Sequence, residues 1–396
     1  MKIGIKYQNN VNMGGDSESI NMLRFPLAIL VVFVHSFGAD IDIVQLHASG
    51  LTGVAVYDYV RLFCSVVIAR SAVPIFFIIS GYLFFLKVEE YGKQVYTNKL
   101  KKRWYSLVIP YLTWNILFML WTLMFIVGGI LLHGKPWNGI SDYFLQNGCL
   151  HMFWNSGVWG ERTTWLGVET HNSGPVLLPF WYMRDLIVMV VLSPVIFWLV
   201  RKTGALFIVL LMAVYAFDIR ISWMSGTFMA AGLFFSLGSY FSIKKQSFTD
   251  VLWRWRYVIL PLAIVLIVWQ TYSGSQMGNA MSRMIHPWLV IIQSFAIILV
   301  ASVMCRYQCC YLLNMKLAKT SFFIYAMHPF ILGRVITGIN KIMPMSDIWY
   351  VMTINYLAAP LTCVGICVGV YWGMRRCLPG VMRMLMGERK TKNLRL

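Results

Sequence analysis

The sequence has few charged residues. They make up 12% of its 396 positions, whereas a soluble globular domain carries about 25%. These charges are too few to cover the surface of a soluble protein of this length. The scarcity also excludes a soluble basic domain, so nucleic-acid binding is excluded even though the net charge is +19.

The cysteines and acidic residues form no recognisable metal or disulfide pattern. The eight cysteines are scattered and include no C-x-x-C pair, so we predict neither a zinc site nor a disulfide scaffold. One long segment contains His151, Glu161, Glu169 and His171, but it lacks a metal-ligand spacing such as H-E-x-x-H. We therefore predict no metal.

Long apolar runs dominate the rest of the sequence, of which 59% is hydrophobic. A helix needs about 20 apolar residues to cross the hydrocarbon layer, and helices are expected because lipid offers free backbone groups no partner. The sequence therefore predicts an all-α membrane bundle. Its ten spans are expected at approximately residues 20–37, 65–86, 107–132, 183–200, 204–219, 226–242, 257–272, 286–304, 320–337 and 351–373.

The distribution of positive charge predicts the orientation of these spans. With the N-terminus in the cytoplasm, 25 of the 34 Lys and Arg residues lie in or beside cytoplasmic segments, and nine lie in or beside outer ones. This bias follows the positive-inside rule and places both termini inside. We expect a cytoplasmic segment at 1–19, one membrane domain at 20–373, and a basic tail at 374–396 that lies on anionic lipid.

The first predicted span, SINMLRFPLAILVVFVHSF, contains Arg24 and His35. Eleven helical residues turn through about 1100°, close to three full turns, so both residues lie on one face roughly 16 Å apart. His35 is expected well inside the bilayer, where a neutral imidazole can accept a proton. This pattern indicates a general base facing a cavity, with an arginine that holds an anion at its mouth. The structural alternative is a snorkelling arginine and a histidine bonded to a neighbouring helix.

The second span carries Arg70 and continues as RSAVPIFFIISGYLFF. Polar residues inside apolar spans are functional candidates because they are costly in lipid, so we include Arg70 and Ser80 among the candidate site residues. Ser80 and Gly81 also permit close approach of another helix. Packing alone therefore remains an alternative explanation of this segment.

A basic cluster precedes the third span in TNKLKKRWYSLVIPYLTW, where Lys99, Lys102 and Arg103 lie close together. Such a cluster is typical of ordinary anchoring on the cytoplasmic side. It is also suited to a phosphate site at a cytoplasmic mouth, because arginine and lysine bind phosphate oxygens.

Two later segments add further polar candidates. In SFFIYAMHPFIL, Tyr325 and His328 continue a polar stripe that starts at Ser321. In PFWYMRDLIVMVVLSP, Arg184 and Asp185 are adjacent. Adjacent helical residues point about 100° apart, so we expect that these two do not share a face and that Arg184 pairs with another helix.

Together these segments resemble the acyltransferase-3 family of bacterial membrane proteins. Arg24 and His35 match its R-x10-H signature. Four further segments follow in the family's order, namely VPIFFIISGYLFF (73–85), KRWYSLVIPYLTW (102–114), PFWYMRDLIVMVVLSP (179–194) and SFFIYAMHPFIL (321–332). The form ARSAVPIFFIISGYL is most similar to the branch containing the O-acetyltransferase of enterobacterial common antigen.

The resemblance implies a multi-pass protein of the bacterial inner membrane that moves an acyl group, usually acetyl from acetyl-CoA, to a hydroxyl of a surface or lipid-linked glycan. It implies that His35 deprotonates the acceptor or first accepts the acetyl group, and that Arg24 is its partner or a donor contact. Many members carry R-x-x-R before the proline of the third span. Here Arg103 matches the first position and Ser106 stands at the second. The neighbouring Lys99, Lys101 and Lys102 are expected to supply the missing charge.

Two other functions remain open on the residues alone. Buried arginine and histidine also suit a transporter or flippase for a glycan or small solute. A membrane sensor whose basic tail recruits a partner is the third possibility. Acetyl transfer from acetyl-CoA by the purified protein distinguishes the enzyme from both.

Overall fold

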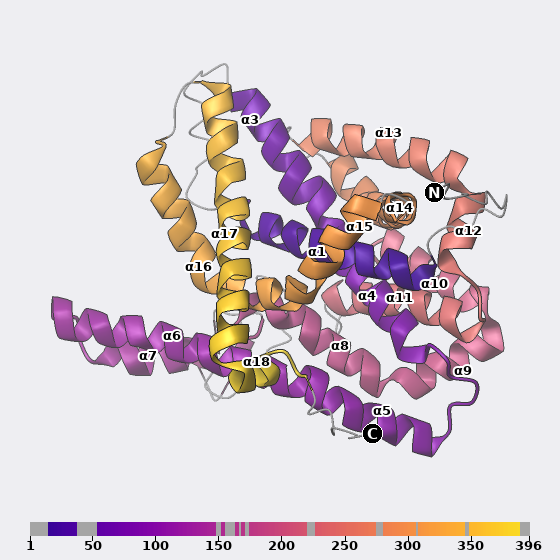
Figure 1. Ribbon diagram of the computed structural model, residues 1–396, viewed down its shortest axis with the longest axis horizontal. Helices are drawn as coiled ribbons and strands as arrows, with labels where there is room; N and C mark the ends of the chain where they lie inside the picture. Colours follow the sequence, from indigo (N-terminus) through magenta and orange to yellow (C-terminus); the bar gives the residue numbers. More distant parts are fainter. Residues whose placement is uncertain are drawn as a thin grey trace, which may run out of the picture.

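The computed structural model shows a bundle of helices (Figure 1). The residues it describes are 15–37, 54–147, 152–154, 163–165, 168–170, 174–219, 226–274, 280–305, 308–344 and 348–388. Within these ranges the only β-structure is an antiparallel hairpin of β1 (Thr163–Trp165) and β2 (Val168–Thr170). The predicted all-α fold is confirmed for the described residues, with this hairpin as the exception.

Seven helical segments of the described chain are long and apolar enough to cross a membrane. They are Asp16–His35, Val54–Phe85, Lys93–His133, Arg256–Gly274, Met281–Met304, Leu312–Ile342 and Trp349–Cys377. An eighth arises if Leu178–Val191 and Ser193–Thr203, bent by 64°, form one span. The other two predicted spans coincide with shorter apolar helices, α10 (Ala205–Ala216) and α11 (Gly226–Ile243). The count of ten and the position of the termini stay predictions.

Helix α1 (Asp16–His35) lies in the middle of the bundle and packs against elements from both halves of the chain (Figure 1). Its neighbours include α4 (Ala72–Phe85), α14 (Ala280–Met304), α15 (Gln308–Leu317), α16 (Ser321–Ile342) and α17 (Trp349–Cys377). A helix packed on several sides needs apolar residues around most of its circumference, and the run FPLAILVVFV supplies them. The polar residues of α1 are thereby held within the bundle.

The second span is not one regular helix. It consists of α3 (Val54–Arg61), a π-helical stretch η1 (Leu62–Ile68), a short 3₁₀ turn η2 (Ala69–Ser71) and α4. The amide of Gln293 on α14 donates hydrogen bonds of 2.9 and 3.0 Å to the carbonyls of Val67 and Ile68. A π-stretch inside a helix often marks a functional region, and here a neighbouring helix satisfies the carbonyls of the break.

Helices α4 and α11 cross at very short range. A Cβ at Gly81 would overlap the carbonyl oxygen of Phe235, and a Cβ at Gly238 would overlap that of Ile78. Small residues at a helix crossing let the two backbones approach closely. The predicted packing role of Ser80–Gly81 is confirmed.

The predicted basic loop is largely helical and leads straight into the third span. Helix α5 (Lys93–Arg103) continues through the π-helical η3 (Trp104–Val108) into α6 (Ile109–His133). No residue of α5 is buried, which suits a basic helix at a membrane boundary. After α6 comes the short α7 (Asn138–Gln146).

The first part of the predicted tail is docked on the bundle. Helix α18 (Pro379–Leu385) buries Met382 and Leu385, and the indole of Trp114 on α6 donates a 3.0 Å hydrogen bond to the carbonyl of Leu385. Residues 389–396 lie outside the described part of the chain. The remaining helices are η5 (Leu178–Phe180), α8 (Trp181–Val191), α9 (Ser193–Thr203), α12 (Phe248–Arg254), α13 (Arg256–Gly274) and η6 (Ala318–Thr320).

Candidate functional site

The structure brings two predicted site residues, His35 and His328, into direct contact. Their ring centroids are 5.1 Å apart with an interplanar angle of 34°. His35 ends α1 and is partly buried, whereas His328 lies in α16 and is fully buried. They are nearly three hundred positions apart in the sequence, so this contact is a product of the fold.

The environment of His328 determines which of its nitrogens carries a proton. Its Nδ1 lies 3.2 Å from the carbonyl oxygen of Ile324. A carbonyl can only accept, so Nδ1 must be the donor and the neutral ring leaves Nε2 as an acceptor. Nε2 is buried and has no hydrogen-bond partner among the described residues. A buried acceptor without a partner is rare in a folded protein and points to a functional use.

A series of aromatic and hydroxyl side chains continues from this pair. The ring of Tyr325 lies 6.5 Å from that of His328, and the ring of Tyr182 lies 6.0 Å from Tyr325. The hydroxyl of Tyr182 is 3.0 Å from that of Ser80 on α4. Tyr325 itself donates a 2.5 Å hydrogen bond to the carbonyl of Pro179. The fold therefore connects five side chains in one series of neighbours, which we call the polar path: Ser80, Tyr182, Tyr325, His328 and His35.

Arg24 lies on α1, as predicted. It shares one face of this helix with His35 and is partly buried. None of the ion pairs among the described residues involves it.

The residues of the basic cluster before the third span have different roles. Lys99 donates a hydrogen bond to the carbonyl of Phe84, next to the C-terminal end of α4, and its Nζ lies 4.8 Å from the centre of the Phe84 ring. A lysine there satisfies a helix-end carbonyl. Arg103 lies 5.6 Å from the same ring and interacts electrostatically with Tyr182. Lys102 is exposed. Arg103 thus stands at the Ser80–Tyr182 end of the polar path.

Comparison with known proteins decides the family. The family model of an acyltransferase domain, the acyltransferase-3 type, matches residues 17–374. The chain belongs to the acyltransferase-3 family. The match runs from the start of α1 almost to the end of α17, so it includes both residues of the histidine pair.

One curated relative is a succinoglycan biosynthesis protein, ExoH, of Rhizobium meliloti (strain 1021). It is 26% identical to this acyltransferase-3 member over 265 residues, which cover 65% of the present chain. The match spans 63% of the relative's own length. No solved structure matches the chain.

The expectation for Arg184 and Asp185 is wrong. The Nε and Nη2 atoms of Arg184 lie 2.8 and 2.7 Å from Oδ1 of Asp185, and both side chains are buried. The pair lies in the opening turns of α8, which begins at Trp181. Because few helical residues precede Arg184, its long side chain has room to bend toward the neighbouring Asp185. The positive end of the helix dipole also stabilises the carboxylate of Asp185.

Arg70 lies in a different environment from the histidine pair. It follows the π-helical stretch and interacts electrostatically with Tyr215 of α10 and His286 of α14. Its own side chain is exposed. No contact joins Arg70 to the histidine pair among the interactions of the described residues.

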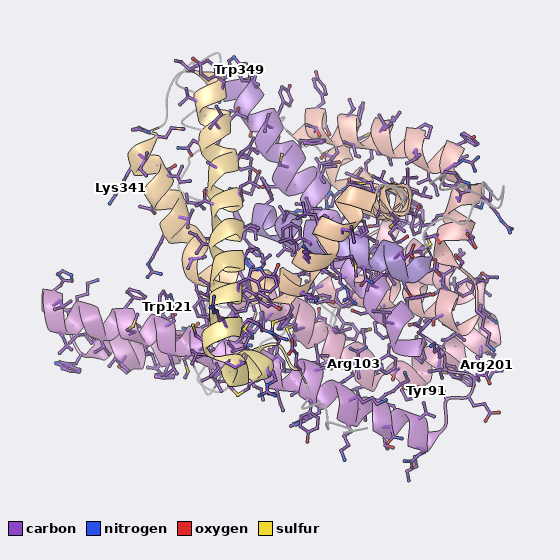
Figure 2. The ribbon with its side chains drawn as sticks, in the orientation of Figure 1. Tyr91, Arg103, Trp121, Arg201, Lys341 and Trp349 are labelled. Carbon is purple, nitrogen blue, oxygen red and sulfur yellow. The ribbon has the colours of Figure 1, made fainter. Side chains whose placement is uncertain are left out.

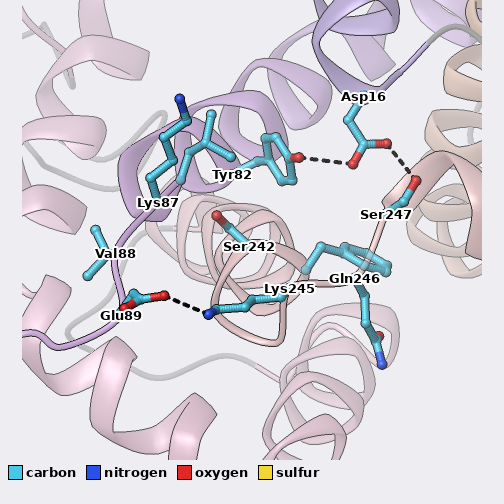
Figure 3. Close-up of a pocket in the computed structure, with 11 residues that line it drawn as sticks. Asp16, Tyr82, Lys87, Val88, Glu89, Ser242, Lys245, Gln246 and Ser247 are labelled. Atoms are coloured by element: carbon cyan, nitrogen blue, oxygen red, sulfur yellow. Dashed lines mark hydrogen bonds and ion pairs between the residues drawn. The ribbon is translucent and has the colours of Figure 1, made fainter.

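One pocket of the described chain lies away from the histidines, at the N-terminal end of α1 (Figure 3). It has a volume of about 500 Å³ and includes Asp16, which accepts hydrogen bonds from Tyr82 at 2.9 Å and Ser247 at 3.0 Å. At its rim, a hydrogen bond and the charge of Lys245 lower the pKa of Glu89. Asp16 is nineteen residues from His35, roughly 28 Å along the helix, so this pocket and the histidine pair are separate features.

Three polar groups of the structure are not among the residues predicted for the site. Tyr182 lies inside the segment PFWYMRDLIVMVVLSP. Asp58 and Arg61 form a buried ion pair at 2.7 Å, and Arg61 also donates to the carbonyl of Phe37, two residues after His35. Arg334 stands inside the apolar run of α16. Charged residues at i and i+3 in VYDYVRLF, and a lone arginine in PFILGRVITG, were the available signals.

The described residues contain no group of three His, Cys, Asp or Glu side chains that could hold a metal ion. His151, Glu161 and His171 lie outside the described residues.

Proposed function

We propose that this protein transfers acetyl from cytosolic acetyl-CoA to a hydroxyl group of a cell-surface or lipid-linked glycan, in the bacterial inner membrane. The contact between His35 and His328 carries the proposal. It places two imidazoles together inside the membrane domain of an acyltransferase-3 member. A histidine is the side chain best suited to take and return a proton near neutral pH.

In the proposed reaction, His35 takes the proton from the acceptor hydroxyl while that oxygen attacks the thioester carbonyl. The bond between carbonyl carbon and sulfur breaks, and the proton passes to the thiolate, which leaves as free CoA. No other reactant is needed. The partly exposed ring of His35 is the one that can meet a substrate, because the ring of His328 is fully buried.

His328 acts on His35 in this proposal. Its Nδ1 is committed to Ile324, so the free Nε2 can accept a hydrogen bond from His35. Such a bond would orient the His35 ring and stabilise the imidazolium that forms during proton transfer. We therefore assign His328 a positioning role and His35 the catalytic one.

The donor is proposed to approach the basic side of the bundle. Acetyl-CoA carries several phosphate charges, and arginine binds phosphate oxygens in a bidentate geometry. Arg103 is the cluster residue that faces the polar path, and Arg24 lies on the helix face that leads to His35. Lys102 is exposed and contributes positive charge at the surface, whereas Lys99 already satisfies a helix end.

Two similarities support a glycan acceptor. The relative from Rhizobium meliloti is named for the biosynthesis of succinoglycan, a polysaccharide. The segment ARSAVPIFFIISGYL is similar to the branch that contains the O-acetyltransferase of enterobacterial common antigen. A hydroxyl of a surface polysaccharide or of its lipid-linked precursor is therefore the proposed acceptor.

A deletion strain tests this function. Surface glycans of the parent and the deletion strain are compared by mass spectrometry, and loss of acetyl groups that the cloned gene restores is the expected result. Purified protein in lipid nanodiscs should then transfer label from acetyl-CoA to the identified glycan. A transporter would alter the amount or location of the glycan and leave its acetylation intact, which would contradict the proposal.

A further inference from the structure

An apolar groove opens on the outside of the bundle where α6 meets α16, α17 and α18. Its volume is about 370 Å³. All of its lining residues are apolar or aromatic, and Trp121, labelled in Figure 2, is one of them. The others are Trp114, Leu117, Leu120, Met124, Phe323, Met327, Phe330, Met374 and Leu385. Leu120 and Met124 are each 52% exposed, so the groove is open along α6.

One charged side chain stands at this groove. The guanidinium of Arg334 lies 5.0 Å from the ring centre of Trp121 and 4.1 Å from that of Phe125. Its Nη1 donates a 3.0 Å hydrogen bond to the carbonyl of Phe330. Trp121 and Phe330 both line the groove, so the charge is fixed beside it.

The position of Arg334 along its helix favours an anionic partner. It lies thirteen residues after the start of α16 and eight before its end, roughly 20 and 12 Å along the axis. It is therefore inside the apolar segment, where an arginine costs several kcal/mol unless it is paired or wetted. Its side chain is exposed, and it belongs to none of the ion pairs found among the described residues.

We propose that the groove and Arg334 form a binding site for a membrane phospholipid. One acyl chain lies along the apolar walls, and the phosphodiester accepts hydrogen bonds from the guanidinium. A guanidinium has five N–H donors, and only one is used by Phe330. The aromatic rings of Trp121 and Phe125 hold the cation in place by cation–π contact.

The number of charges favours a phospholipid over a carrier lipid of the acceptor glycan. None of the residues that line the groove is charged, and the guanidinium of Arg334 is the cation held against the ring of one of them, Trp121. One positive charge matches the single negative charge of a phosphodiester. A polyprenyl diphosphate carries more than one negative charge, which a single guanidinium cannot neutralise. The proposal does not depend on the acetyl transfer proposed above.

Native mass spectrometry of the purified full chain tests this site. The protein is titrated with dioleoylphosphatidylglycerol and, separately, with dioleoylglycerol, which has the same acyl chains and no phosphate. We expect one tight phosphatidylglycerol adduct and a weaker dioleoylglycerol adduct. Arg334→Gln should weaken the first about tenfold (1.4 kcal/mol) and leave the second unchanged. Lys341→Gln, an exposed cation nearer the end of the same helix, should change neither.

A second pair of variants tests the groove itself. Leu120→Trp fills part of it and should weaken both lipids, whereas Leu132→Trp, at an 80% exposed site near the end of α6, should not. If Arg334→Gln does not fold, Arg334→Lys is used instead. This variant keeps the positive charge and loses the planar guanidinium, so it should bind phosphatidylglycerol less tightly than the unchanged protein does. The proposal is overturned if the affinity for phosphatidylglycerol is unchanged in both Arg334 variants. It is also overturned if undecaprenyl diphosphate binds tenfold tighter than phosphatidylglycerol through the same residues.

Discussion

The imidazole rings of His35 and His328 lie 5.1 Å apart at the meeting of α1 and α16. The two helices pack directly against each other and bury Ala28 and Val32 of α1 with Ile324 of α16 in one apolar cluster. This packing fixes the distance between the rings. The histidine pair is thus built on two rigid helices, which hold reacting groups more precisely than loops do.

His328→Ala should lower acyl transfer by about tenfold or more and should change its pH profile, because it removes the acceptor that orients His35. A role limited to packing would lower the thermal stability and leave the pH profile of the remaining activity unchanged. The His35 and His328 variants should also be strongly non-additive in the double mutant, as expected for residues that act as a unit. Additive losses would contradict the positioning role.

Arg103→Gln should raise KM for acetyl-CoA about tenfold with a smaller change in kcat, because a charge-assisted contact to phosphate contributes mainly to donor binding. Lys99→Gln provides the comparison. Lys99 is bonded to the carbonyl of Phe84, so its loss should lower the melting temperature more than it raises KM. Equal KM effects in the two variants would contradict this division of roles.

Gly81→Ala should strongly destabilise the protein, since the added methyl group would overlap the backbone of α11 at Phe235 and overpacking costs about 1–3 kcal/mol or more. Gly232→Ala is a matched control on α11, because a Cβ there meets nothing within 4 Å. Alanine is the better helix former by roughly 0.5–1 kcal/mol, so the control should be neutral or stabilising. Thermal unfolding in detergent measures both.

Asp185→Asn should destabilise the bundle by about 3 kcal/mol, because it removes a buried carboxylate that accepts two bonds from Arg184. Glu89→Gln breaks the ion pair with Lys245, in which both side chains are more than two-thirds exposed. That exposed pair should contribute almost nothing. Similar melting temperatures for the two variants would show that the Arg184–Asp185 pair is not a structural element.

Much of the site was predictable because polar residues inside apolar runs are few. Arg24, His35, Tyr325 and His328 stand out on that ground alone. Their pairing was not predictable, since the packing of α1 on α16 decides which histidine meets which partner. Periodicity describes one helix at a time and gives no information about its neighbours.

Two features of the structure differ from the sequence-based predictions because they depend on side-chain reach and on contacts between helices. Arg184 and Asp185 were placed on different faces because the 100° rule fixes Cβ directions and ignores the reach of a long arginine side chain. The break in the second span was not predicted, because LFCSVVI is as apolar as a regular span. Two carbonyls of its π-helical turn accept hydrogen bonds from Gln293, which lies more than two hundred residues away in the sequence.

The most direct test of the account is the acyl-transfer activity of His35→Gln in purified protein reconstituted into lipid nanodiscs. The account predicts a loss of about 10²–10⁴-fold with normal expression and melting temperature, while His133→Gln, an exposed histidine at the end of α6, retains full activity. Transfer of acetyl to the glycan at the native rate by His35→Gln would contradict the central claim.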